Sequence, residues 1–390
     1  MRYLALAIFL AGTLISSAAF GQWSDKTLQR RFVEAMEQLD AGNLAQAEKM
    51  LRDLLGYTGA PRVKLELART LYLQGKYAEA KKLFNEVSTQ SDTPWRVVDN
   101  VQHFVQQIEE RAGYLKFGLT TIADSNPRNL AAQKEFAIGD LRVTPTEAPK
   151  KVYGLRYSMR AWKPVTELGG GGYITASYND YPGQDLDRLT ADAGIAKNLN
   201  DSGSIRGKAG VELGTFGGKR LYHFPYLGFD AVLAESPSYR VTTELKAGKV
   251  RFADFGYLDA THTSAAFSVR KVMSEAATVS MSSSVERSSA NERPYSYYGW
   301  ELGPGVNTFW PKTALLVGAR ASIGTRKYAD VDPLFGERRV DTRHRAEVSV
   351  GNKNWRWRNS YVSLVGSLEE NRSNIGFYSY RKTSISVVVE

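Results

Sequence analysis

The sequence predicts an α+β chain in which a small α-helical domain precedes an all-β transmembrane barrel of about 14 antiparallel strands. Three features support this fold class: an apolar N-terminal segment, a helical pattern that repeats up to residue 112, and a strand pattern that recurs from residue 113 onward. A chain of 390 residues has room for a large barrel and one small module. The mean hydropathy of −0.35 argues against a helical membrane protein. It does not argue against a barrel, whose strands offer only every second side chain to lipid.

The first 21 residues have the layout of an export signal. Arg2 gives a positive start, residues 3–15 are mostly apolar, and small residues follow, so cleavage is expected before Gln22 or at Ala19. The apolar run is too short to span a bilayer, and a buried N-terminal helix is the alternative interpretation. The predicted organisation is a signal peptide at 1–21, a periplasmic helical domain at 22–112 and an outer-membrane barrel at 113–390. The chain contains no cysteine, which excludes disulfides, thiolate chemistry and lipid attachment to the chain itself.

Residues 27–111 contain two helical units at a spacing of 33 residues, and Pro61 and Pro94 keep the same offset. Small residues let two helices cross closely, Gly takes the turn, and Pro starts the next unit. This is the layout of the tetratricopeptide (TPR) repeat, one residue shorter than usual. A third helix over 95–110 is expected to cap the stack, and a generic pair of helical hairpins is the alternative. So small a groove suits docking or gating. The signature positions are Ala35, Gly42, Ala47, Ala68, Gly75, Tyr77 and Ala80.

From residue 113 on, segments with alternating apolar side chains are separated by turn residues or charged loops. A strand's period of two puts the alternate side chains on opposite faces. An even number of strands suits a single-chain bacterial barrel. A further candidate at 134–143 is an extracellular hairpin arm or a misassigned strand. The predicted strands are 113–121, 151–163, 170–181, 186–198, 204–215, 219–234, 238–251, 257–272, 277–289, 296–309, 314–327, 338–353, 360–373 and 378–390.

One face of these strands is charged and rich in glycine, so it is expected to line a wet lumen, while the other faces lipid. The predicted lumen-facing charges are Arg206, Lys208, Glu212, Arg240, Glu244, Lys246, Arg320 and Arg343. The net charge of +10 indicates an anion-leaning pore or contact with lipopolysaccharide, and nucleic acid is not an expected partner. Aromatic residues at strand ends predict interfacial girdles made of Tyr295, Tyr297, Tyr298, Trp300, Trp310, Trp355, Trp357, Phe377, Tyr378 and Tyr380.

The segment 332–341, followed by Arg345, resembles a characteristic part of the surface lipoprotein assembly modulator (Slam) barrel domain. Segment 371–381 is similar to the penultimate loop and last strand of that family, and segment 124–127 is a weaker match. Together the resemblance covers roughly residues 113–390, and a TPR-bearing N-terminal domain is also typical of the family. The residues that carry it are Asp332, Pro333, Phe335, Gly336, Arg338, Arg339, Asp341, Arg345 and Asn374.

The resemblance implies an outer-membrane translocon of a Gram-negative bacterium that exports a surface or secreted protein, often a lipoprotein, through or beside the barrel. Its expected partners are the exported protein, a periplasmic chaperone, the barrel-assembly machinery, outer-membrane lipid and lipopolysaccharide. The charges of Arg338, Arg339, Asp341 and Arg345 fall where an extracellular loop enters a strand. They predict an Arg–Asp network that holds the lumen or its exit shut until substrate arrives. The alternative is that these charges only fix the loop or bind lipopolysaccharide.

No catalytic or fuel-binding motif is visible. The four His residues are scattered without metal-ligand spacing, and no GxxxxGK[ST] loop occurs. We therefore expect no enzyme activity, metal or cofactor. A polysaccharide-export or diffusion porin with a periplasmic TPR scaffold is the second hypothesis, and the segment 332–341 favours the translocon over it. A soluble TPR protein with a β-sandwich fits the alternating strands poorly.

Overall fold

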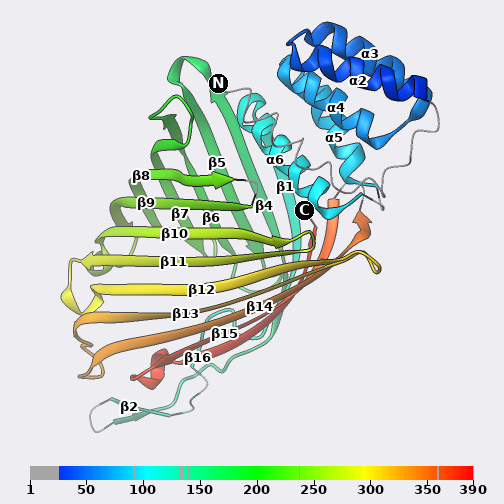
Figure 1. Ribbon diagram of the computed structural model, residues 1–390. Helices are drawn as coiled ribbons and strands as arrows, with labels where there is room; N and C mark the ends of the chain where they lie inside the picture. The colour runs from blue at the N-terminus through cyan, green and yellow to red at the C-terminus, as the bar shows by residue number, and fades with distance from the viewer. Residues whose placement is uncertain are drawn as a thin grey trace. The chain divides into compact units, whose positions relative to one another are not determined.

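The computed structural model describes residues 26–90, 93–131, 133, 135–138, 141–236, 238–357 and 360–389. The chain divides between Gly113 and Tyr114 into two compact units, of which the first is helical and the second is a closed barrel (Figure 1). This confirms the predicted fold class. The expected signal peptide, residues 1–21, lies outside the described residues.

In the described residues from 26 on, the helical unit consists of two helical hairpins and a fifth helix. Gly42 and Gly75 sit at the hairpin turns with φ of +82° and +78°, a conformation that glycine adopts without strain. Pro61 is the first residue of the helix α4 (Pro61–Leu73), and Pro94 directly precedes the helix α6 (Trp95–Ala112), as the repeat predicts. The helices are α2 (Lys26–Asp40), α3 (Leu44–Thr58), α4 (Pro61–Leu73), α5 (Tyr77–Ser88) and α6 (Trp95–Ala112).

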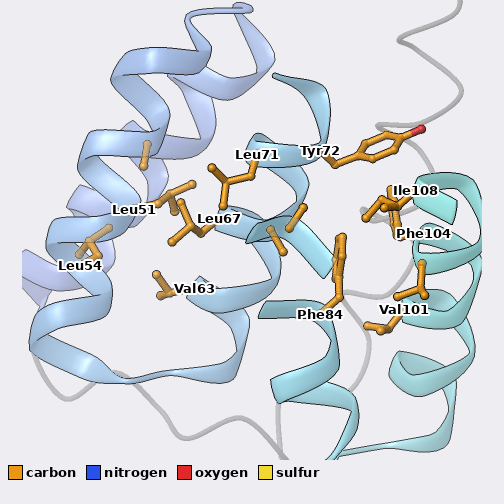
Figure 2. Close-up of a cluster of buried hydrophobic side chains, with 14 of the residues drawn as sticks. Leu51, Leu54, Val63, Leu67, Leu71, Tyr72, Phe84, Val101, Phe104 and Ile108 are labelled. Atoms are coloured by element: carbon orange, nitrogen blue, oxygen red, sulfur yellow. The ribbon is translucent and has the colours of Figure 1, made fainter. Parts of the chain in front are cut away.

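The predicted small positions let the helices approach closely. Four of them, Ala35, Ala47, Ala68 and Ala80, have no exposed surface. Larger side chains fill the remaining space, and the rings of Phe84 and Phe104 stack with centroids 5.1 Å apart (Figure 2). Because Phe104 comes from α6, this helix completes the core of the repeat. Among the described residues, no helix combines the length and apolar character needed to cross a membrane.

Glu48 ties the two hairpins together. Its carboxylate accepts hydrogen bonds from Arg52 on its own helix, at 2.8 Å, and from the Lys76 ammonium, at 2.7 Å, just before α5. Burial alone would raise the pKa of this carboxyl group. Hydrogen bonds from Lys76, Arg52 and Gln74 outweigh burial and lower the pKa of Glu48 to about 2. A carboxyl group with a lowered pKa stabilises the fold above its unfolded pKa, and that contribution is lost as the pH falls toward the folded value.

We expect the isolated helical unit, residues 26–113, to lose stability as the pH falls from about 4.3 to about 2. Glu48→Gln should be less stable at neutral pH and show less of this decline, because it has no carboxylate to protonate. Urea unfolding followed by circular dichroism across this range would measure both effects. Glu37→Gln, at an exposed position of α2, is the control and should keep the wild-type profile. Identical profiles for the two variants would contradict this role of Glu48.

The barrel is a closed antiparallel wall of 14 strands. Each strand pairs with its neighbours in sequence, and β1 pairs with both β4 and β16, which closes the sheet (Figure 1). The strands are β1 (Tyr114–Asp124), β4 (Val152–Val165), β5 (Gly170–Asp180), β6 (Arg188–Asn198), β7 (Ile205–Phe216), β8 (Lys219–Ser236), β9 (Tyr239–Phe252), β10 (Ala260–Ser274), β11 (Ala277–Ala290), β12 (Tyr297–Trp310), β13 (Leu315–Val331), β14 (Arg338–Trp357), β15 (Ser360–Ser373) and β16 (Tyr380–Val389).

Consecutive strands alternate in direction, so the segments 125–151, 332–337 and 374–379 all lie at one end of the barrel, which we call the loop end. The first of them contains β2 (Phe136–Ile138) and β3 (Leu141–Val143), which pair only with each other. The candidate strand at 134–143 is therefore a hairpin arm outside the wall.

Short 3-10 turns lie in several loops, just before the strand that follows. The turn η2 (Gly256–Leu258) replaces the start of the strand predicted at 257–272. Asp259 closes this turn by accepting a hydrogen bond from the Phe252 N–H at 2.7 Å. The turn η4 (Gly376–Tyr378) covers the first residue of the strand predicted at 378–390, and the turn η3 (Arg293–Tyr295) lies just before the strand predicted at 296–309. At other places the wall is longer than predicted, since β13 extends to Val331 and β14 to Trp357.

The register separates two faces of the wall. Large apolar side chains are exposed on one face, among them Phe117 at 70% and Leu227 at 69%. The residues that alternate with them along each strand point to the other face, and these are mostly charged, hydroxyl-bearing or glycine residues. An apolar band around a closed sheet is stable where hydrocarbon surrounds it.

We expect the folded barrel to resist detergent at room temperature and to change gel mobility on boiling. A variant with the export signal joined directly to Ala112 should show the same shift, because each unit has its own stabilising contacts. Membrane fractions run with and without boiling would test both statements. Degradation of the shortened chain would mean that the helices are needed to build the barrel.

Candidate functional site

The segment 332–337 is a tight turn built by Asp332. Its carboxylate oxygen Oδ1 accepts the N–H groups of Leu334 at 2.9 Å and Phe335 at 3.2 Å. Gly336 has φ +68°, which favours glycine there, and Pro333 is exposed. The second carboxylate oxygen of Asp332 accepts the Tyr378 hydroxyl at 2.8 Å. One side chain therefore shapes the turn and fastens it to the next loop.

Below this turn, Arg339 and Asp341 form a sheltered ion pair on the inner face. Two guanidinium nitrogens bind the two carboxylate oxygens at 3.0 and 2.6 Å, and Asp341 is only 4% exposed. The guanidinium also lies 3.5 Å from the centroid of the Tyr378 ring and 4.6 Å from that of Tyr328. Arg338 is exposed. Of the predicted network at the loop entrance, the structure thus brings Arg339 and Asp341 together and leaves Arg338 apart.

Asn374 joins the start of β14 to the loop that follows β15. Its Oδ1 accepts the Val340 N–H at 2.7 Å and its Nδ2 donates to the Arg338 carbonyl at 3.0 Å. Its own N–H donates to the Val340 carbonyl at 3.2 Å. The side chain thus extends the backbone pairing of the wall into the loop.

Aromatic rings connect three loops above these polar contacts. The ring of Phe377 lies 5.5 Å from that of Phe335 and 5.4 Å from that of Phe136 in the hairpin arm. Tyr378 lies 5.3 Å from Phe377. We call these four rings, with the Asp332, Arg339 and Asp341 contacts, the loop clasp. It holds the segments 125–151, 332–337 and 374–379 together.

Further from the loop end, charges of both signs pair across the inner face. Arg345 binds Glu369 at 3.0 Å and Glu301 at 3.2 Å, and therefore links β12, β14 and β15. Lys246 binds Glu212 at 2.8 Å across β8. Bonds that skip a strand require side chains on the concave side of the wall.

The register puts all eight predicted lumen charges on this inner face. Lys208 pairs with Asp230, and Arg240 lies 3.6 Å from Glu235. Arg206 lies over the ring of Trp162. The other positions follow from register alone, which aligns Glu244 with Asp230, Arg320 with Glu347, and Arg343 with Asn371.

One side of the inner face carries a cluster that the sequence analysis did not single out. The Tyr226 hydroxyl donates to the Asp192 carboxylate at 2.8 Å and contacts the Tyr173 hydroxyl. Gly194 and Gly210 make room for it, because a Cβ on Gly210 would lie 2.5 Å from the Tyr173 oxygen and 2.9 Å from that of Tyr226. Strand parity was the signal that could have found this cluster, since all five residues have inward parity.

The predicted aromatic girdle is wrong in part. Tyr297 and Tyr380 point inward, where their hydroxyls donate to Glu286 at 3.4 Å and Glu369 at 2.6 Å. Phe377 and Tyr378 belong to the loop clasp, and Tyr295 ends the turn η3. Inward parity and loop geometry override the preference of aromatic residues for the interface. Of the predicted girdle, the residues that stay exposed on the outer face are Tyr298, Trp300, Trp310, Trp355 and Trp357.

A closed antiparallel barrel with an apolar outside and a charged inside is an outer-membrane β-barrel. The family model "surface lipoprotein assembly modifier" matches residues 114–390, and a tetratricopeptide repeat model matches residues 38–94. The chain therefore belongs to the surface lipoprotein assembly modifier family. No sequence among the curated proteins matches it.

Similar solved structures are outer-membrane proteins. The channel DcaP of Acinetobacter baumannii has 10% identity and a TM-score of 0.41, covering 72% of this chain and 98% of its own. A bacterial polysaccharide outer membrane secretin has 11% identity and a TM-score of 0.37, covering 70% and 97%. A BenF-like porin from Pseudomonas fluorescens has 8% identity and a TM-score of 0.37, covering 71% and 97%.

Asp341→Ala should destabilise the loop end, because it leaves the Arg339 guanidinium sheltered and without its carboxylate partner. A loss on the order of 3 kcal/mol is expected for such a change. Protease nicking of the segments 332–337 and 374–379 in the folded barrel should accelerate. Arg338→Ala, which removes an exposed charge one residue from Arg339, should cut at the wild-type rate. Equal rates for both variants would show that the ion pair does not hold the clasp.

Proposed function

We propose that this chain is an outer-membrane translocon that exports a surface-exposed or secreted protein, with a surface lipoprotein as the preferred substrate. The observation that carries the proposal is the family match over the whole barrel, residues 114–390. Transport of this kind involves no chemical step on the substrate, so the proposal needs no catalytic residue or cofactor.

The inner face supports passage of a polypeptide. A chain that crosses hydrocarbon must satisfy its backbone N–H and C=O groups, because no water is available there. Inner charges of both signs, such as Arg345 with Glu369 and Lys246 with Glu212, offer donors and acceptors along the wall. Their mutual pairing keeps them from binding one ion type tightly. Such a surface is suited to a substrate of mixed charge.

The loop clasp is proposed to be the gate. With the helical unit in the periplasm, the chain enters β1 from that side and the loop end faces the exterior. The clasp then ties three external loops together through Asp332–Tyr378, Arg339–Asp341 and the Phe377 rings. Opening requires these contacts to break together, which would keep the exit shut until substrate arrives.

We propose further that the helical unit docks a periplasmic partner, either a chaperone that delivers the substrate or the substrate itself. The outer rim would contact lipopolysaccharide, and the barrel-assembly machinery would insert the strands. These partners follow from the location of the barrel and from the repeat type of the helical unit.

A polysaccharide or diffusion porin is the competing function. Sugar channels need aromatic faces open to the lumen, on which rings of the sugar stack. In this barrel the inward aromatics Phe224 and Tyr226 are buried, and Lys246 covers the Tyr226 ring at 3.9 Å. These two inner aromatic residues are thus used within the wall, which supports the translocon over the sugar channel.

The test compares surface proteins of the host with and without this chain. Whole cells are shaved with protease, and the released peptides are identified by mass spectrometry. One or a few surface proteins should disappear in the deletion strain while their total cellular level persists. If the loop clasp is the gate, Asp341→Ala should admit large antibiotics that wild-type cells exclude, at equal barrel level, and Arg338→Ala should not. An unchanged surface profile in the deletion strain, with altered uptake of oligosaccharides, would favour the porin.

A further inference from the structure

The junction between β1 and β16, where the barrel closes, is paired less than the rest of the wall. β1 pairs with β4 along its whole length, from Tyr114 to Asp124. Among the described residues its pairs with β16 run from Leu119 to Asp124, and Ser125 adds one backbone bond, from its N–H to the Thr383 carbonyl at 3.0 Å. This ladder is interrupted between Thr120 and Ala123. Because backbone pairing holds a barrel together, we call this junction the seam.

A side chain replaces a backbone acceptor inside the interruption. The Val387 N–H donates to the Thr121 hydroxyl oxygen at 2.9 Å. Just beyond β1, the Thr383 N–H donates to the Ser125 hydroxyl oxygen at 2.8 Å. A hydroxyl group can rotate toward another partner, so each of these two bonds can break without breaking the backbone pairs beside it.

The β13–β14 and β14–β15 ladders also have interruptions without proline, at register shifts after Lys327 and Gly351, but two other interruptions have a different cause. The β8–β9 ladder skips Pro225 and the β12–β13 ladder skips Pro304, because proline has no N–H to donate. The β12–β13 gap is flanked on both sides by six pairs, and the β8–β9 gap by two pairs on one side and a longer paired segment on the other. The Thr215 hydroxyl accepts the Leu189 N–H at 3.2 Å, but at the end of its ladder. The seam combines an internal gap without proline and a short overlap.

The loop end of the seam is fastened by Asn126, which is only 1% exposed. Its side chain binds the N–H and the carbonyl of Leu130, both at 2.8 Å, and donates to the Arg381 carbonyl on β16 at 3.4 Å. Asp124 accepts the Asn126 N–H at 2.8 Å. The segment 124–127 therefore forms a fastening made of side chains across the seam.

We propose that the seam is the place where the barrel wall parts during export, and that an extended segment of the exported polypeptide pairs with the freed edges of β1 and β16. This inference rests on the proposed translocon function and adds the part of the wall that moves. A strand edge offers alternating N–H and C=O groups, and an extended polypeptide is the partner that satisfies them in register. The hydroxyl bonds of Thr121 and Ser125 are the first to be exchanged.

The test is a covalent lock across the seam. The chain has no cysteine, so an introduced pair is unique. Thr120 and Val388 face each other across the seam on the inner face, between hydrogen-bonded positions, where paired Cα atoms lie about 4.5 Å apart and a disulfide fits. The matched control is Ser158 with Ser177, an inward pair of the same kind at the β4–β5 junction.

In the double variant Thr120→Cys with Val388→Cys, surface display of the proteins lost in the deletion strain should be abolished while the disulfide is present. A membrane-permeable reductant should restore it. The control Ser158→Cys with Ser177→Cys and each single variant should display these proteins normally. Heat-dependent gel mobility verifies that all barrels are assembled.

The outcomes separate the two proposals. Display that persists in the locked seam, in a host where deletion abolishes it, overturns the seam and leaves the translocon standing. Loss of display in both locked variants overturns the seam as well, since a general stiffening would then be responsible. An unchanged surface profile on deletion overturns the translocon itself.

A second readout does not depend on any substrate. If the seam is the weakest junction, its lock should raise the temperature of the gel-mobility transition more than the β4–β5 lock does. Thr121→Val should lower that temperature more than Thr215→Val, which removes a similar hydroxyl bond at the end of a ladder. Equal shifts for the two locks would place the weak point elsewhere and overturn the inference.

Discussion

The requirement that every strand edge find a partner governs the second unit of this molecule. In hydrocarbon an unpaired backbone group costs several kcal/mol, so the sheet must close, and β1 must reach β16. Closure fixes the alternation of faces, since a register slip of one residue would turn every apolar side chain inward. The lumen charges, the external loops and their contacts then have defined places.

Closure also concentrates the irregular contacts at one location. The hairpin arm, the Asp332 turn and the η4 loop meet beside β1 and β14–β16, on the side where the pairing of the wall is shortest. Side chains replace missing backbone pairs there, as Asn374 does for β14 and Asn126 does for β16. A part of the barrel that has few ladder bonds but many replaceable side-chain bonds is suited to movement.

Much of this architecture could be predicted from the sequence, because it depends on period alone. The 33-residue offset placed Gly42 and Gly75 at turns and four alanines in the helical core, and alternation placed Arg206 or Arg320 on the inner face. Single contacts were harder to predict. Tyr297 and Tyr380 were assigned to the interface by residue type, although their parity directs them toward Glu286 and Glu369.

The contacts of the loop clasp and the seam lay beyond prediction for a different reason. They join residues far apart in the chain, such as Asp332 with Tyr378 or Asn126 with Arg381, and no local pattern encodes their distance. The bonds of Ser125 and Thr121 depend on how two terminal strands meet after the whole sheet has closed. Local propensity says nothing about such a meeting.

The tyrosine cluster of the inner face has a consequence for the evolution of this wall. Tyr173 and Tyr226 fit only because Gly194 and Gly210 lack a side chain, and Asp192 accepts the Tyr226 hydroxyl. A mutation at Gly210 is blocked while the rings are present, and loss of a ring leaves a hollow that a larger residue could fill. At Gly194 the Ala209 carbonyl oxygen, 2.4 Å from where a Cβ would lie, blocks a side chain as well. These positions, spread over four strands, should therefore covary among homologues. The width of the lumen at this level would then change only when several of them change together.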